Sequence, residues 1–194
     1  ETHLQAIREM TKSELVDIML MSASTCERLC DEGLFNDSPV TPAIRLNDTT
    51  CIWSARGGRY KEQPSRHHRT ARIDQARKYT NLGLYSVTFS NERDIDAINA
   101  EAYSEFRAEA AEYSMRHFLE IFNPAFDINL EGNAEIGSFI NDNIVRTLAG
   151  VMEADFPCFL KLQYNGAGAM EELCSYDPKH LIVGILGGSA GTAR

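Results

Sequence analysis

Cys158-Phe-Leu-Lys161-Leu and Leu181-Ile-Val-Gly-Ile-Leu186 are two apolar runs, each about as long as a buried strand. Roughly ten residues with helical character separate them. A strand, a helix and a second strand in this order form a unit whose strands run parallel, because the helix returns the chain to the same edge. The first run carries Lys161 among apolar residues, and the second leads into the glycine-rich turn Gly187-Gly188-Ser189.

The rest of the chain repeats this alternation. Apolar residues at helical spacing predict helices over 1–14, 91–113 and 140–151, and a shorter one around 25–33. Strands are expected at 14–21, 40–47, 82–89 and 118–122. With the two runs above, these segments predict one α/β domain over residues 1–194, with a parallel sheet that is either open or closed into a barrel.

Composition excludes several classes of protein. The 194 residues carry a net charge of −9, which argues against broad binding of nucleic acid or of an anionic membrane. The sequence contains no apolar run of the ~18 residues that would span a bilayer and no recognisable secretory leader. The 5 cysteines are scattered and odd in number, which is typical of reduced thiols in a cytoplasmic protein. We expect neither a metal nor a cofactor.

A basic segment interrupts this acidic chain at residues 54–80, where 8 lysines and arginines face 2 acidic residues. A loop of this length is often functional. It is either a lid that brings an arginine to a phosphorylated substrate, or a subunit contact or mobile loop. Arg45, at the end of its predicted strand, is the better-placed ligand for an anion.

Lys161 is the first candidate for chemistry. If its ammonium is desolvated within the fold, its pKa falls and the free amine becomes a nucleophile. Attack on a carbonyl gives a Schiff base, which acts as an electron sink for carbon–carbon cleavage or formation. The alternative is a structural lysine that extends to solvent or pairs with a buried carboxylate.

Glu120 is the expected partner of Lys161, because it lies at the same relative depth in the preceding strand. It orients the amine, shuttles protons, or forms a structural ion pair. Tyr164 follows Lys161 by three residues and is a candidate proton donor at the strand mouth. The alternative for Tyr164 is simple packing.

The turn Gly187-Gly188-Ser189 is a candidate phosphate site, because glycines let successive backbone N–H groups approach an anion closely. It matches neither the Walker pattern nor the dinucleotide fingerprint. A plain tight turn is the alternative reading.

These residues resemble a known family. Lys161-Leu-Gln-Tyr164-Asn-Gly166 with Ile182-Val-Gly-Ile-Leu-Gly187-Gly188 is similar to strands six and seven of class I aldolases of the archaeal fructose-bisphosphate aldolase type. It also resembles the related enzymes that act on a phosphorylated autoinducer-2 sugar. The resemblance implies a (β/α)8 TIM barrel in which Lys161 forms the Schiff base and the glycine pair binds the substrate phosphate.

The sequence departs from the family in three respects. Leu186 stands where the family often has serine, and no fifth-strand tyrosine serves as proton donor. The family's first and eighth strands are not found, so we expect that the chain ends before the barrel closes.

The sequence therefore predicts a metal-independent, homo-oligomeric aldolase-like lyase that acts on a small phosphorylated carbonyl compound. Lys161 is the expected nucleophile, Glu120 or Tyr164 the proton handler, and Gly187, Gly188 and Ser189 the phosphate cradle, with Arg45 as a further anion ligand. Two alternatives are another phosphate-binding barrel enzyme, such as an isomerase or synthase, and an inactive barrel that serves as a binding module.

Overall fold

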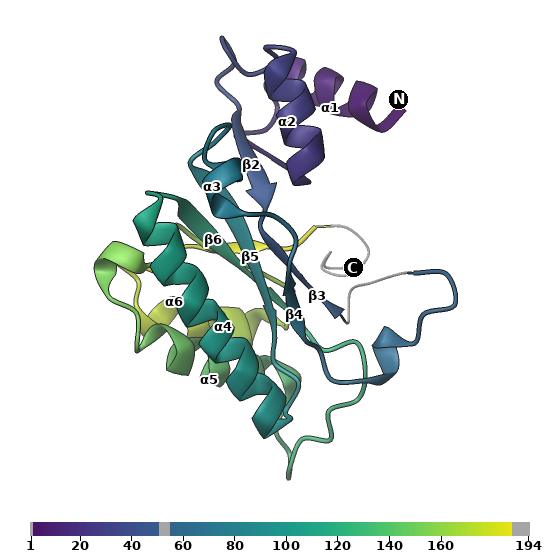
Figure 1. The fold of residues 1–194 in the computed structure, drawn as a ribbon. Coiled ribbons are helices and arrows are strands. Elements are labelled where there is room, and N and C mark those ends of the chain that lie inside the picture. Colours follow the sequence, from purple (N-terminus) through teal and green to yellow (C-terminus); the bar gives the residue numbers. More distant parts are fainter. Residues whose placement is uncertain (1, 51–54, 188–194) are drawn as a thin grey trace.

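The computed structural model of the protein describes residues 2–50 and 55–187. Its centre is a parallel sheet with the strand order β1-β2-β5-β6-β7-β8. The strands are β1 (Ile18–Met21), β2 (Thr41–Arg45), β5 (Leu82–Thr88), β6 (Arg116–Phe122), β7 (Leu160–Leu162) and β8 (Val183–Ile185). The helices are α1 (Thr2–Ser13), α2 (Ala23–Asp31), α3 (Ile73–Ala76), α4 (Arg93–Glu112), α5 (Ile136–Leu148) and α6 (Ala167–Tyr176), with short 3-10 turns η2 (Tyr60–Glu62) and η3 (Glu153–Asp155). Figure 1 shows α4, α5 and α6 together on one side of the sheet.

The prediction of an eight-stranded barrel is wrong. The described residues form a six-stranded parallel half-barrel sheet, in which β1 pairs with β2 and β8 pairs with β7. A closed barrel requires every strand to have two neighbours, and β1 and β8 each have one among the described residues. The alternation of strands and helices left an open sheet and a barrel as equal possibilities, and the family resemblance suggested the closed form.

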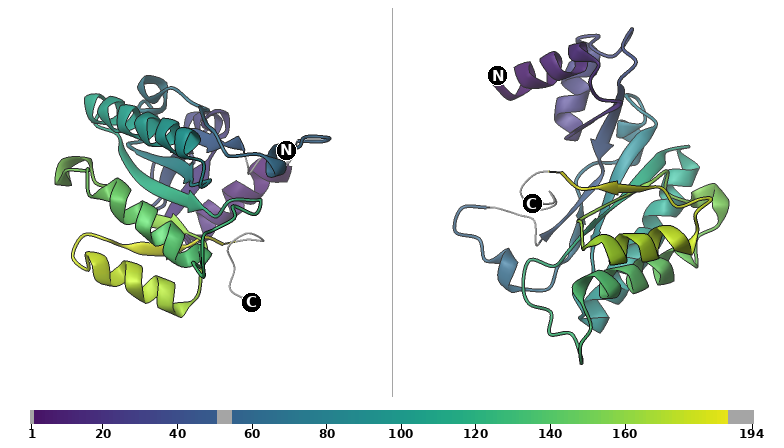
Figure 2. Two further views of the ribbon diagram at one scale, coloured as in Figure 1. Left: turned by 90° about the horizontal axis from the view of Figure 1, so that it is seen from below. Right: turned by 180° about the vertical axis from the view of Figure 1, so that it is seen from behind.

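The two sides of the sheet carry different residues, because successive side chains of a strand point to opposite faces. In β5, Tyr85 and Val87 belong to the main core between sheet and helices, whereas Leu82 and Leu84 belong to a separate apolar cluster. That second cluster is completed by Ala43 and Phe118, with Ile18, Leu20, Cys158 and Phe159 packed against it. No residue of a described helix takes part in it, so this part of the inner face is lined by strands and by the residues just before β7. Figure 2 shows the helices on the other face from two further directions.

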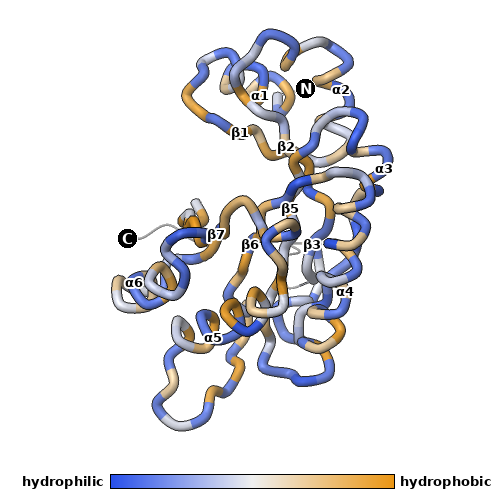
Figure 3. The backbone as a smooth tube through the Cα atoms, turned by 90° about the vertical axis from the view of Figure 1, so that its left-hand side faces the viewer, coloured by the Kyte–Doolittle hydropathy of each residue, from blue (hydrophilic) through white to orange (hydrophobic). Residues whose placement is uncertain are grey.

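The helices dock through apolar stripes of helical period. In α4 the buried residues include Ala102, Phe106 and Ala110, spaced four apart. In α5 the stripe includes Ile140 and Ile144. Hydrophilic and hydrophobic colours alternate along these helices in Figure 3, as expected for helices with one buried face. None of the described helices combines the length and the apolar character needed to cross a membrane.

A small antiparallel hairpin was not predicted from the sequence. Its strands β3 (Asn47–Thr49) and β4 (His67–Arg69) pair so that Asp48 lies opposite His68. The first strand follows directly on β2, where one longer strand was expected, and the second lies inside the basic segment that was treated as a loop. Both strands have three residues, too few for a period of two to be recognised.

Candidate functional site

The register of the sheet places three polar side chains in one row. Ser86 in β5 lies beside Glu120 in β6, and Glu120 lies beside Lys161 in β7. Their neighbours along the strands, such as Leu119 and Leu162, belong to the core on the helix side. Alternation therefore directs Ser86, Glu120 and Lys161 to the inner face of the half-barrel.

Glu120 is the centre of this row. Its Oε1 accepts a hydrogen bond from Lys161 Nζ at 2.6 Å, and its Oε2 accepts one from Ser86 Oγ at 2.8 Å. The Glu120 side chain is 1% exposed, whereas the Lys161 side chain is 27% exposed. A buried carboxylate needs partners at both oxygens, and here both have one. The Lys161 side chain is therefore the more exposed of the pair.

Arg45, the last residue of β2, extends the row on the other side. Its Nη1 lies 3.5 Å from Glu120 Oε2 and 3.7 Å from Asp48 Oδ1. Nη1 is buried, and neither contact has the geometry of a hydrogen bond. A buried donor without an acceptor is costly, so an anionic oxygen of a ligand would be stabilised at this atom.

Asp48 is a second carboxylate in the cluster, placed by the hairpin. Burial raises the pKa of Asp48, and the nearby charge of Glu120 raises it further. The guanidinium of Arg45, the backbone N–H of Thr49 and the charge of His68 oppose this rise in pKa. Burial therefore favours the protonated form of Asp48 more than it is favoured in an exposed aspartate.

Asn47 anchors the hairpin that carries Asp48. Its Nδ2 donates to the carbonyl oxygen of Ser86 at 2.8 Å, and its Oδ1 accepts from the backbone N–H of Ser86 at 2.6 Å. The amide side chain thus pairs with β5 as a backbone strand would. Asp48, the next residue, is thereby held near the row that contains Ser86 and Glu120.

The structure brings together only part of the predicted site. Lys161, Glu120 and Arg45 form one cluster. Tyr164 lies beyond the end of β7, is 40% exposed, and forms no hydrogen bond with Lys161, Glu120 or Arg45. Gly187 follows β8, is exposed, and has open space where a side chain would stand. Gly188 and Ser189, the rest of the predicted phosphate cradle, lie outside the described residues.

Ser86, Asn47 and Asp48 were missed from the sequence. Ser86 follows Leu82 and Leu84 on one face of the predicted strand 82–89, and this change from apolar to polar residues was the available signal. Asn47 and Asp48 follow the strand that ends at Arg45. Asn47 meets Ser86 because the β2–β5 register continues past Arg45, whereas Asp48 lies in a strand that pairs with the distant strand β4. Nothing in the local sequence encodes that contact.

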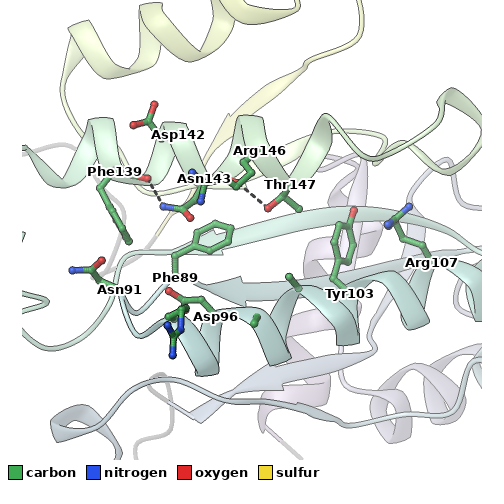
Figure 4. A pocket seen from close by; sticks show the side chains of 13 residues that line it. Phe89, Asn91, Asp96, Tyr103, Arg107, Phe139, Asp142, Asn143, Arg146 and Thr147 are labelled. Atoms are coloured by element: carbon green, nitrogen blue, oxygen red, sulfur yellow. Dashed lines mark hydrogen bonds between the residues drawn. The ribbon is translucent and has the colours of Figure 1, made fainter.

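A separate groove lies on the opposite, helix-covered side of the sheet. It measures about 700 Å³ and is lined by residues of α4, α5 and the segment after β5, among them Phe89, Arg107 and Arg146. Figure 4 shows these side chains between the two helices. None of them belongs to the Lys161 cluster, so the groove is not part of the candidate site.

The cluster combines the groups that Schiff-base chemistry requires: an amine, adjacent carboxylates and a cation for an anionic substrate. No group of three or more histidine, cysteine, aspartate or glutamate side chains is placed to hold a metal ion in residues 2–50 and 55–187. A comparison with models of protein families found no match, and a comparison with curated proteins found none either.

Proposed function

We propose that this protein forms a Schiff base between Lys161 and a small phosphorylated carbonyl compound, and uses it to cleave or form a carbon–carbon bond. The observation that carries the proposal is the position of Lys161. Its side chain stands on the inner face of a parallel sheet and is partly exposed, and its amine lies 2.6 Å from a carboxylate that is 1% exposed. The resemblance of its strand to that of class I aldolases supports the same reaction.

The proposed first step uses both residues. Lys161 must lose a proton before its nitrogen can attack, and Glu120 Oε1 is at hydrogen-bond distance to receive it. The nitrogen then bonds to the carbonyl carbon. The carbonyl oxygen leaves as water with two protons, one from the nitrogen and one returned by Glu120, and the positively charged imine withdraws electrons from the adjacent carbon–carbon bond.

Arg45 supports the choice of an anionic substrate. Its Nη1 is a buried donor without an acceptor, and a phosphate or carboxylate oxygen would satisfy it. Ser86 holds the far oxygen of Glu120 and so fixes the carboxylate that faces Lys161. In this proposal, the predicted phosphate turn at Gly187 contributes from the end of β8.

The test is reductive trapping at the lysine. The protein is incubated with dihydroxyacetone phosphate or glyceraldehyde 3-phosphate and sodium borohydride, and the adduct is located by peptide mass spectrometry. We expect one reduced adduct on Lys161. Lys161→Arg is the matched control, because it retains a cation beside Glu120 and forms no imine. Absence of an adduct at Lys161, or equal labelling of exposed lysines such as Lys12, would contradict the proposal.

The short contact between Lys161 and Glu120 also favours a second candidate function. If the ion pair between Lys161 and Glu120 is permanent, the lysine acts only as a charge. The protein is then a phosphate-binding isomerase or synthase, or a binding module without catalysis. This candidate predicts that phosphate esters bind with an affinity that depends on Arg45, with no trapped adduct. Isothermal titration with both sugar phosphates, beside the trapping experiment, separates the two candidates.

A further inference from the structure

The two carboxylates of the site are engaged to different extents. Both oxygens of Glu120 already accept hydrogen bonds, from Lys161 and from Ser86, and its side chain is 1% exposed. Because both oxygens are engaged, Glu120 has no free oxygen that could accept a further proton from a bound molecule. A second proton acceptor is needed for a reaction that also breaks a bond to carbon.

Asp48 has the properties that Glu120 lacks. Its Oδ1 accepts the backbone N–H of Thr49 at 2.9 Å and lies 3.7 Å from Arg45 Nη1. Its Oδ2 has no hydrogen-bond partner among the described residues, and its side chain is 20% exposed. Arg45 lies between the two carboxylates, within 3.7 Å of each. Arg45 therefore connects Asp48 to the Lys161–Glu120 pair, and the three carboxylate and amine groups form one continuous cluster.

We propose that Asp48 is the second proton-transfer residue of this site, and that it exchanges the proton on the carbon next to the imine. The inference rests on the proposed function, because it requires a carbonyl compound bound to Lys161. In the step that we assign, the carbon–hydrogen bond breaks and its electron pair forms a carbon–carbon double bond. The carbon–nitrogen π pair returns to the Lys161 nitrogen, which becomes neutral, and the proton moves to Asp48 Oδ2. The reverse step returns the proton to carbon.

The surroundings of Asp48 fit an exchangeable proton. The charged groups that face it are Arg45 from β2, His68 from β4 and Glu120 from β6, with Lys161 beyond Glu120. Burial, the largest effect, raises the pKa of Asp48 above that of an exposed aspartate. Since the carboxylate form accepts the proton, we expect exchange to slow as the pH falls through this raised pKa.

The experiment separates formation of the imine from transfer of the proton. The intact protein is incubated with dihydroxyacetone phosphate in D₂O, and exchange of the carbon-bound protons is followed by nuclear magnetic resonance. Borohydride trapping is measured on the same sample. For Asp48→Asn we expect the trapped adduct to persist within about twofold, while exchange slows by roughly 100-fold or more. Asp48→Glu should recover part of the exchange rate and shift its dependence on pH.

The controls make every result informative. Asp37→Asn removes a carboxylate from the exposed loop before β2 and should change neither readout. Retained trapping by Asp48→Asn shows that this variant folds; if it does not trap, Asp48→Glu with normal trapping serves in its place. Wild-type exchange rates in Asp48→Asn, or an exchange profile that does not move in Asp48→Glu, would overturn the role of Asp48 and leave the imine intact. Failure of the wild-type protein to form an adduct would instead overturn the proposed function, and this inference with it.

Discussion

Lys161 Nζ lies 2.6 Å from Glu120 Oε1, and the two residues are register partners in neighbouring parallel strands. Glu120 Oε2 also accepts a hydrogen bond from the hydroxyl of Ser86 and lies 3.5 Å from Arg45 Nη1. One buried carboxylate therefore accepts two hydrogen bonds and lies beside a third, cationic group, and the three groups come from three different strands. The pairing of Lys161 with Glu120 both stabilises the inner face of the sheet and sets the position of the amine.

The first prediction concerns the free energy of unfolding. Lys161→Met leaves Glu120 buried without its nearest cation, and we expect a loss of about 2 kcal/mol, below the value for a fully buried pair because solvent reaches Lys161. Glu120→Gln should lose a similar amount. The double variant should lose less than the sum, because it does not leave one charge of this pair alone. Urea unfolding of the four proteins measures this coupling.

The same cycle with Lys12 in place of Lys161 is the control. Lys12 lies exposed on α1, so Lys12→Met and Glu120→Gln should add within the usual error of about 0.5 kcal/mol. Strict additivity for Lys161 and Glu120 as well would show that the pair contributes no coupling to stability.

The second prediction concerns the anchor of the hairpin. Asn47→Ala removes both hydrogen bonds to the backbone of Ser86, and we expect a loss of roughly 2 kcal/mol. Asn47→Asp should lose more at pH 7, because the new carboxylate is buried and faces the Ser86 carbonyl oxygen without a donor. At about pH 4.5 this excess should shrink, because a protonated carboxyl group donates where Nδ2 donated. Urea unfolding at both values of pH provides the measurement.

Asn133→Asp, on an exposed loop, is the control and should change stability by less than about 0.5 kcal/mol at either pH. If Asn47→Asp were as stable as the wild-type protein at pH 7, the amide of Asn47 would not anchor the hairpin.

The sequence was sufficient to predict the pairing of Lys161 with Glu120. Each is the one charged residue at mid-depth of an apolar strand, and neighbouring parallel strands place such positions side by side. Arg45 was predicted as an anion ligand because it ends its strand, and that role stays a prediction, whereas the sheet order does bring Arg45 to the face of Lys161 and Glu120. The positions of all three residues could be read from the sequence because they lie on regular strands whose alternation is visible locally.

The failures concern contacts that are not local. The position of Asp48 depends on a hairpin whose second strand begins at His67, and three-residue strands leave no readable period. The prediction of a closed barrel was wrong for a different reason. Six strands could be identified in the sequence. Closure would require the first of them to pair with the last, and this pairing is a property of the whole sheet. A family resemblance over residues 158–192 cannot establish it.

The last prediction concerns acid stability and a residue on the helix side of β6. His117 is 4% exposed, and its Nε2 lies 2.8 Å from the hydroxyl of Tyr103. Burial lowers the pKa of His117 to about 4, and the guanidinium of Arg107 lowers it in the same direction. In the unfolded chain the pKa of this histidine is about 6.5. Between pH 4 and pH 6.5 the imidazole is therefore protonated in the unfolded state and neutral in the folded state. The stabilising effect is complete above pH 6.5 and is lost as the pH falls towards 4.

We therefore expect the wild-type protein to lose about 3 kcal/mol between pH 6.5 and pH 4 on account of His117. His117→Gln keeps a hydrogen-bonding partner for Tyr103 and does not titrate, so its unfolding free energy should fall by that much less over the same range. His3→Gln, at an exposed position of α1, should follow the wild-type curve. Urea unfolding of the three proteins at half-unit steps of pH gives the comparison. Parallel curves for wild type and His117→Gln would mean that His117 takes up its proton in the folded state as readily as in the unfolded chain.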